Sequence, residues 1–368
     1  MIDPVKILRR AWYILWNYRT LWVFGLILAL ATAGSSGGGN NGMQYQSDGN
    51  NDQPTPQSMQ EFFNDFSREM EKLFNEGVPE MDISGQALTT FLWIIGVFIV
   101  FMLLVGILVA IARYVSETSV IRMVDEYENT GTKMTVRQGF RIGWSRAAWR
   151  LFLINLIVHL PLIFMFLIFF IVGLIMLVAF GNGNANLNMV SIAAIIGLVF
   201  LVIFVVIILS IVLSLLRHFF WRVSVLEDTG VRESLRRGFA MVRENWKSVG
   251  LVWLVMLGLG IAWIIVSIVA FIITIPLVIV TGIIAAIVAA IPALLLVGVF
   301  SLFLSGPLPW IAAGLFVLPL FLIIAFSPWL LLGSWKTVYT STVWTLTYRE
   351  IKALPALIPV TEDEPVGD

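Results

Sequence analysis

Two very long stretches of this chain carry no charged side chain. No Lys, Arg, Asp or Glu occurs from Leu151 to Leu216, or from Ser248 to Trp335. A helix needs about 20 apolar residues to cross the hydrocarbon core of a bilayer, and core helices of soluble proteins do not run this long without charge. The sequence therefore predicts an all-α integral membrane protein.

The composition narrows the function classes. Charged residues make up 12% of the chain, about half of the roughly 25% found in soluble domains. The formal net charge is zero, so no nucleic-acid partner is expected. The chain has no cysteine, which excludes disulfides and thiolate metal sites.

A polar connector segment occurs twice in the chain, next to the apolar stretches. "ENTGTKMTVRQGF" begins at Glu128 and "EDTGVRESLRRGF" begins at Glu227, and the ends of both resemble "LRRAW" at 8–12. Gly131 and Gly230 stand where helices end with a left-handed residue, which glycine adopts without steric cost. Each copy precedes an apolar span and a second span that returns. The pattern predicts six transmembrane helices as three repeated hairpins, with basic helices lying in the plane of the membrane.

The repeat divides the chain into segments. The predicted spans cover 20–33, 88–113, 149–180, 189–217, 249–275 and 309–335. The predicted parts are an interfacial helix with the first span (1–33), an outer loop (34–85), the second span with its polar end (86–131), a second hairpin unit (132–230), a third hairpin unit (231–350) and a C-terminal tail (351–368).

Charge bias predicts the orientation. Residues 113–150 hold seven Lys or Arg against four acids, and residues 217–247 have the same tally. The loop 34–85 has two basic residues against nine acids. Cytoplasmic loops are enriched in Lys and Arg. Both termini and both connectors are therefore expected in the cytoplasm, and 34–85 outside.

The stretch 276–308 does not fit a simple count of crossings. One full span there would place the C-terminus outside, and the stretch is too short for two. Pro292 lies near its middle, and proline disfavours a continuous helix. The sequence thus predicts a re-entrant segment made of two half-depth helices, 277–291 and 293–304. A seventh span is the open alternative.

The outer loop holds an apolar helical stripe. After a tether rich in Gly, Ser and Asn, residues 57–77 place apolar side chains on one face and acids on the other. The apolar face consists of Phe62, Phe63, Phe66, Met70 and Phe74. Two interpretations remain open: a helix that lies at the membrane surface or caps the bundle, and a docking face for a second copy or a membrane-protein partner.

The connectors carry arginines at helical spacing. These are Arg137, Arg141, Arg232, Arg236 and Arg243. Basic amphipathic helices beside membrane spans bind anionic lipid headgroups, so membrane lipids are predicted partners. Ordinary anchoring and topology explain the same residues. Glu128 and Glu227 are expected to pair with connector arginines in a structural role.

One polar pair lies inside a predicted span. Asn155 and His159 are one helical turn apart, near the expected middle of the bilayer. An ionisable group at this depth is a functional hypothesis, although a neutral histidine that is hydrogen-bonded needs no function. No acid or second histidine accompanies it at that depth. We therefore expect no metal, no cofactor and no enzymatic activity.

The repeated units resemble a family of bacterial membrane proteins. The residues that carry the resemblance are 8–12, 128–140, 227–239 and "TLTYRE" from Thr345. They are similar to the membrane domain that precedes some glycerophosphodiester phosphodiesterases and to its uncharacterised stand-alone relatives. The resemblance implies a multi-pass protein of the bacterial cytoplasmic (inner) membrane. The soluble phosphodiesterase domain is absent, so its activity is not implied.

Two function classes follow from these patterns. The first is a non-enzymatic structural, assembly or lipid-interacting membrane component. The second is a transporter or channel for an uncharged or lipid-like substrate, which the repeats and the predicted re-entrant segment favour. Ion-coupled transport is expected to place carboxylates within the spans, and these spans have none. The first class is therefore preferred.

Overall fold

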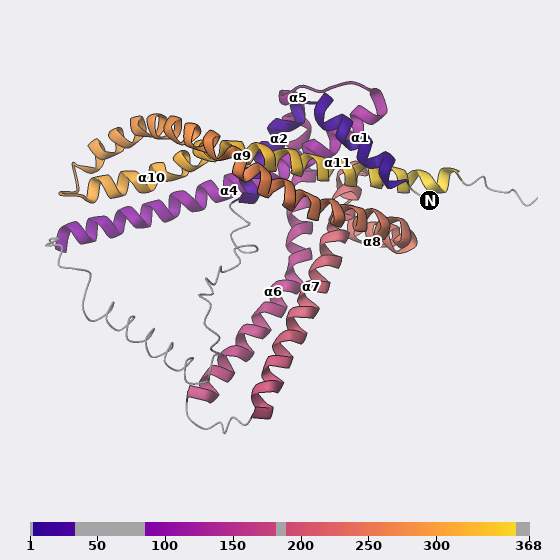
Figure 1. Cartoon of the computed structure of the whole chain (residues 1–368), viewed down its shortest axis with the longest axis horizontal. Helices are drawn as coiled ribbons and strands as arrows, with labels where there is room; N and C mark the ends of the chain where they lie inside the picture. The colour runs from indigo at the N-terminus through magenta and orange to yellow at the C-terminus, as the bar shows by residue number, and fades with distance from the viewer. Residues whose placement is uncertain (1–2, 34–84, 182–188, 358–368) are drawn as a thin grey trace, which may run out of the picture. The chain divides into compact units, whose positions relative to one another are not determined.

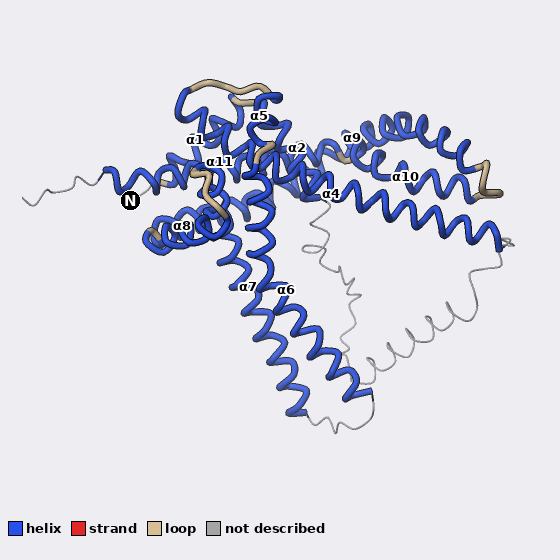
Figure 2. The backbone as a smooth tube through the Cα atoms, turned by 180° about the vertical axis from the view of Figure 1, so that it is seen from behind, coloured by secondary structure: helices blue, strands red, loops and turns tan. Residues whose placement is uncertain are grey.

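The regular structure is helical throughout the part of the chain that is described. The computed structural model describes residues 3–33, 85–181 and 189–357 (Figures 1 and 2). The helices are α1 (Pro4–Asn17), α2 (Thr20–Ala33), α4 (Gly85–Thr130), α5 (Val136–Gly143), α6 (Arg146–Gly181), α7 (Met189–Leu226), α8 (Val231–Glu244), α9 (Trp246–Phe300), α10 (Leu308–Ala325) and α11 (Ser327–Leu357).

Five of these helices are long and apolar enough to cross a membrane. The segments are Leu92–Thr130, Arg146–Ile171, Gly197–Leu226, Trp246–Phe300 and Leu308–Ala325. A sixth crossing results if α1 and α2, which meet at 100°, count as one bent span. By itself α2 has 14 residues and extends about 21 Å, which is less than the roughly 30 Å hydrocarbon core. The predicted all-α membrane fold is confirmed.

The chain forms two compact units, and α4 and α9 each contribute to both. The first unit comprises residues 1–31, 108–275 and 328–368, and the second comprises 32–107 and 276–327. In the second unit, the Thr281 hydroxyl of α9 donates to the Ala325 carbonyl of α10 at 2.7 Å. Phe316 of α10 packs edge-on against Phe98 of α4, with ring centroids 5.1 Å apart.

The first unit has an apolar core formed by helices from both ends of the chain. Its largest cluster buries side chains of α1, α2, α4, α7 and α11, among them Leu21, Phe24, Val120, Val223 and Val338. A second cluster buries Leu151 and Ile154 of α6 with Phe220 of α7. Accordingly α6 and α7 lie side by side as a hairpin (Figures 1 and 2).

Local chemistry explains where the short helices begin. The Asp3 carboxylate accepts hydrogen bonds from the first backbone amides of α1, and Pro4 follows at a position where its missing N–H costs nothing. At α5, Thr135 and Gln138 form a reciprocal capping box. These caps satisfy amides that would otherwise have no partner at a helix start.

The two predicted glycine stops differ. Gly131 ends α4 with φ +70°, and its amide donates to the Tyr127 carbonyl at 2.9 Å, as predicted. The prediction for Gly230 is wrong, because Gly230 has φ −67° and caps the start of α8. Asp228 adopts the left-handed conformation instead, with φ 52°. Aspartate tolerates this region better than most side chains.

The predicted re-entrant hairpin is wrong in its local structure. Helix α9 continues through Pro276 and Pro292 to Phe300, so 277–291 and 293–304 are not separate helices. The following turn contains Gly306 at φ +65°. The predicted span 309–335 is also not one helix, because α10 ends at Ala325 and α11 begins at Ser327.

Candidate functional site

Small residues hold the basic helices against the core of the first unit. Ala11, Gly139 and Gly238 occupy the same position of "LRRAW", "VRQGF" and "LRRGF", and all three are buried. A Cβ at Gly139 would lie 2.6 Å from the Phe24 ring, and one at Gly238 would lie 2.5 Å from the Phe220 ring. Only a very small residue permits these approaches, so one face of α5 and of α8 is fixed inward.

The opposite faces carry the five predicted arginines. Arg137 and Arg141 on α5, and Arg232, Arg236 and Arg243 on α8, are all exposed. None of the five has a hydrogen bond or ion pair with another residue of the described chain. Trp144 caps the end of α5, Trp149 lies in the first turn of α6 and Trp246 begins α9; all three are 63–71% exposed. We call these five arginines and three tryptophans the basic aromatic surface; it has two parts, one around α5 and one around α8.

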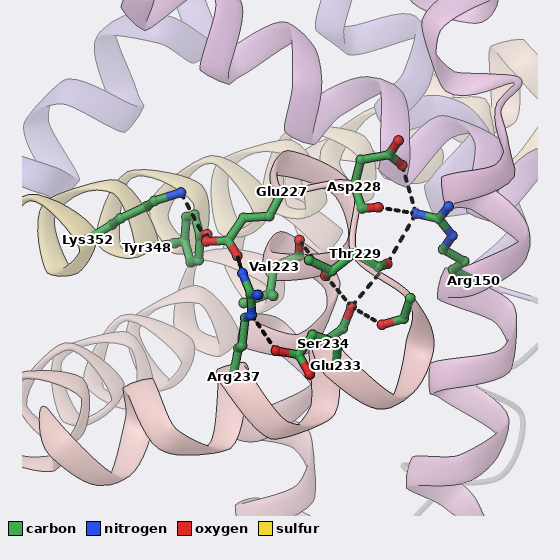
Figure 3. A network of polar contacts seen from close by, with 11 residues as sticks. Arg150, Val223, Glu227, Asp228, Thr229, Glu233, Ser234, Arg237, Tyr348 and Lys352 are labelled. Atoms are coloured by element: carbon green, nitrogen blue, oxygen red, sulfur yellow. Dashed lines mark hydrogen bonds and ion pairs between the residues drawn. The ribbon is translucent and has the colours of Figure 1, made fainter.

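Both repeated glutamates make ion pairs. The Glu128 carboxylate accepts from Arg10 Nε at 2.8 Å. The Glu227 carboxylate accepts from the Tyr348 hydroxyl at 2.7 Å, from Lys352 at 3.0 Å and from Arg237 at 3.2 Å (Figure 3). The predicted pairing with a connector arginine is thus confirmed for Glu227, through Arg237.

Helix α11 connects the ends of both repeated connectors. Its Arg349 bonds the Asp125 carboxylate and the Asn129 side chain near the end of α4. One residue earlier, Tyr348 bonds Glu227 after the end of α7. The "TLTYRE" segment therefore has a structural role: it ties α4 and α7 together.

A second set of polar contacts, centred on Arg150, fixes the turn before α8. One Arg150 nitrogen donates to the Asp228 carboxylate and to the Asp228 carbonyl, both at 2.7 Å, and to the Thr229 carbonyl at 3.1 Å (Figure 3). The Ser234 hydroxyl donates to the Gly230 carbonyl at 2.8 Å. Arg150 thus holds Asp228 in its left-handed conformation.

The Glu227 network predicts an acid dependence of stability. Burial alone raises the pKa of the Glu227 carboxyl, but the bonds from Tyr348, Lys352 and Arg237 outweigh it, so the pKa is lowered overall. A lowered pKa in the folded state stabilises the protein above the unfolded pKa of about 4.3, and this stabilisation is lost as the pH falls through the folded value. At pH 7, Glu227→Gln should cost about 2 kcal/mol.

This dependence can be measured as unfolding midpoints of the purified protein between pH 3 and pH 7. The difference between the natural protein and Glu227→Gln should shrink in acid. Glu244→Gln is the matched control, because Glu244 is exposed and has no ion pair in the described part of the chain. A difference that stays constant from pH 7 to pH 3 would contradict the assignment.

The predicted intramembrane pair, Asn155 and His159, makes one contact within α6 and one with α7. The ring Nδ1 of His159 lies 2.7 Å from the Asn155 carbonyl oxygen of its own helix. Arg217 of α7 donates to the Asn155 side-chain oxygen at 3.3 Å. This contact joins α6 to α7. Arg217 ends the predicted span 189–217 and begins the charged segment that follows it. Its contact with Asn155 therefore brings a cation closer to Asn155 and His159 than the sequence predicted.

A buried charged cluster was not predicted. Arg222 of α7 is fully buried, and its guanidinium donates to the His218 carbonyl at 2.8 Å and to the Ser341 carbonyl at 2.9 Å. The Glu117 carboxylate of α4 lies 4.0 Å from Arg222 and accepts from the Ser341 hydroxyl at 2.8 Å. The signal in the sequence is the polar run "SETS" at 116–119, within the apolar helix α4.

The first unit also contains an apolar cavity of about 930 Å³. Its walls come from α1, α7, α9 and α11. Neither Asn155 nor His159 lines it. Volumes of about 300–1,000 Å³ are typical of small-molecule sites. The other predicted site, the apolar face of Phe62, Phe63, Phe66, Met70 and Phe74, lies outside the described residues.

Comparisons with known proteins give one match. The model of a family of unknown function (DUF7544) matches residues 10–344. No curated protein and no solved structure matches the chain. The match does not involve glycerophosphodiester phosphodiesterases, so that resemblance stays a prediction. Because the family model matches most of the chain, the protein belongs to the DUF7544 family of unknown function.

Proposed function

We propose that this protein is a non-enzymatic, lipid-interacting component of the membrane whose basic aromatic surface binds anionic headgroups. The observation that carries the proposal is the division among its arginines. Arg10, Arg150, Arg222, Arg237 and Arg349 are held by protein partners. The five arginines of the basic aromatic surface are exposed and have no such partner in the described chain.

The composition of this surface fits a membrane–water boundary. Tryptophan is enriched where headgroups meet hydrocarbon, because its ring is apolar and its N–H is polar. A Lys or Arg near an anionic bilayer surface contributes about 1 kcal/mol of attraction. The surface has both residue types: its arginines lie on α5 and α8, whose inner faces are fixed by Gly139 and Gly238, and its tryptophans follow these two helices in the sequence.

The proposal includes the orientation that the charge bias favours. Both termini and the basic aromatic surface then lie on the cytoplasmic side of the bacterial inner membrane, and the three hairpins are repeated units. Residues 57–77 remain a proposed contact for a second copy or a membrane-protein partner.

Transport is the less favoured alternative. A transport route through the pair Asn155 and His159 would need a polar path to reach it. His159 instead bonds its own helix, and the cavity of the first unit is lined by other residues. The contacts of the pair support a role in packing α6 against α7.

A titration of the detergent-solubilised protein with short-chain lipids tests the proposal. Anionic phosphatidylglycerol should raise the thermal unfolding midpoint more than zwitterionic phosphatidylcholine does. The triple variant Arg232→Gln, Arg236→Gln, Arg243→Gln should weaken the phosphatidylglycerol effect by at least about tenfold in apparent Kd. The unfolding midpoint without lipid should change little, because these side chains are exposed.

The matched control replaces the same three arginines with lysine, which keeps the charge. This variant should retain most of the preference for phosphatidylglycerol, and added salt should weaken it. Equal responses of the glutamine and lysine variants, or equal effects of the two lipids on the natural protein, would contradict the proposal.

A further inference from the structure

The cavity of the first unit is lined by aliphatic and aromatic side chains. Each of its four helices contributes a stripe at helical spacing, such as Ser210, Ser214 and His218 on α7. Six tryptophans line it: Trp12, Trp16, Trp253, Trp263, Trp335 and Trp344. Such walls are apolar but contain indole N–H donors.

The shape suits an alkyl chain. The stripe on α9 extends from Trp253 to Val266, along about 20 Å of helix. One leaflet of a bilayer holds its chains within about 15 Å, half of the roughly 30 Å core. A single lipid-like tail therefore matches the length of the cavity.

Two residues of the lining each carry a buried polar atom without a hydrogen-bond partner in the described structure. Trp335 Nε1 and His218 Nδ1 are buried and form no hydrogen bond in the described structure. An indole N–H can only donate, and leaving a buried donor without an acceptor costs about 1–3 kcal/mol. Trp335 therefore places an unsatisfied donor next to the cavity wall.

The charge in the lining is positive. Lys336 lines the cavity and is exposed. It has no ion pair within the described chain, and no Asp or Glu is among the described lining residues. A cation at an otherwise apolar site attracts an anionic group and excludes a second cation.

We propose that this cavity binds an amphiphile whose single alkyl tail lies among the tryptophans and whose anionic head, a carboxylate or a phosphate, pairs with Lys336. This site is separate from the basic aromatic surface and does not depend on it. Two sources offer this chemistry: a bilayer phospholipid that inserts one of its two acyl chains, and a fatty acid from solution.

Binding of radiolabelled palmitate to the purified full chain in detergent tests the proposal. Binding should be saturable, and cetyl alcohol, which has the same tail without the charge, should compete at least about fivefold more weakly than unlabelled palmitate. Lys336→Gln should weaken palmitate binding by a similar factor and leave cetyl alcohol unaffected. The matched control is Lys133→Gln, an exposed lysine that does not line the cavity.

A second variant blocks the tail site. Gly260 lines the cavity, and a Cβ added there meets no atom within 4 Å. Gly260→Leu should therefore fill the cavity without a clash, and leucine also favours the helix. It should weaken palmitate and cetyl alcohol alike by about tenfold or more. Gly258→Leu is the matched control, because Gly258 is equally open but does not line the cavity.

The source of the ligand is decided by adding short-chain phosphatidylglycerol as a competitor. Stronger competition than by palmitate assigns the site to bilayer lipid, and weaker competition assigns it to free fatty acid; either result supports the proposal. It is overturned if no saturable binding occurs, if Lys336→Gln and Lys133→Gln behave alike, or if Gly260→Leu binds palmitate as Gly258→Leu does.

Discussion

Replacing Arg222 with Ala is expected to lower the free energy of unfolding by about 3–5 kcal/mol. The guanidinium is fully buried and bonds two carbonyl oxygens, of His218 and Ser341. Its loss leaves both oxygens short of a donor and leaves the Glu117 carboxylate buried without its cation. An unpaired buried charge is among the most destabilising changes a single substitution can make.

Denaturant unfolding in mixed micelles measures the effect. Arg141→Ala is the control, because Arg141 is exposed and has no ion pair in the described chain, and it should change stability by less than about 0.5 kcal/mol. The double variant Glu117→Leu, Arg222→Met should recover much of the loss, since apolar replacements of a buried ion pair are often neutral. Equal stability of Arg222→Ala and Arg141→Ala would show that the cluster does not stabilise the fold.

Gly143→Ala is expected to cost about 1–3 kcal/mol. Gly143 ends α5 against α4, and a Cβ there would overlap the Ser119 hydroxyl and lie 2.5 Å from the Val115 carbonyl oxygen. That oxygen belongs to a helix backbone and cannot rotate away. The added methyl group must therefore push α5 away from α4, which also strains the bond from Ser119 to the Gly139 carbonyl.

The same substitution at Gly258 provides the comparison. A Cβ at Gly258 meets no atom within 4 Å, so Gly258→Ala should be neutral or stabilising by up to about 1 kcal/mol through helix propensity. Unfolding midpoints of the two variants, measured side by side, test the packing of α5. If Gly143→Ala matches Gly258→Ala, then α5 does not lie as closely against α4 as the structure has it.

The spans could be predicted because their cause is local. A bilayer core offers no partner for charges, so each long stretch without charge indicates a helix that crosses or lies within it. Gly131 was predictable for the same kind of reason, since its position at a helix end favours a residue that adopts positive φ. Within these stretches, residues 151–181 and 189–216 accordingly lie in α6 and α7, and residues 248–300 lie in α9.

The positions where helices end depend on tertiary contacts, which the local sequence does not reveal. Pro292 was expected to divide 276–308, but membrane helices tolerate proline where other groups satisfy the freed backbone, and α9 is continuous there. Gly230 was expected to be left-handed because Gly131 is. In the second connector, Arg150 holds Asp228 by three hydrogen bonds, and Gly230 is left to cap α8.

The candidate sites show the same limit. The five arginines were predictable from their spacing, because exposure on a helix face follows from sequence alone. Arg237 was not singled out as the partner of Glu227, because that pairing requires α8 to fold back along α7. The cluster of Glu117, Arg222 and Ser341 joins residues more than 100 positions apart, so no local pattern contains it.

Native mass spectrometry of the protein released from nanodiscs tests the lipid-binding account most directly. The discs would hold equal amounts of phosphatidylglycerol and phosphatidylcholine, and the ratio of the two lipids that stay bound would be measured. We expect the natural protein to retain phosphatidylglycerol preferentially. Replacing Arg137, Arg141, Arg232, Arg236 and Arg243 with Gln should bring the ratio close to that of the disc. An unchanged preference in this variant would contradict the account.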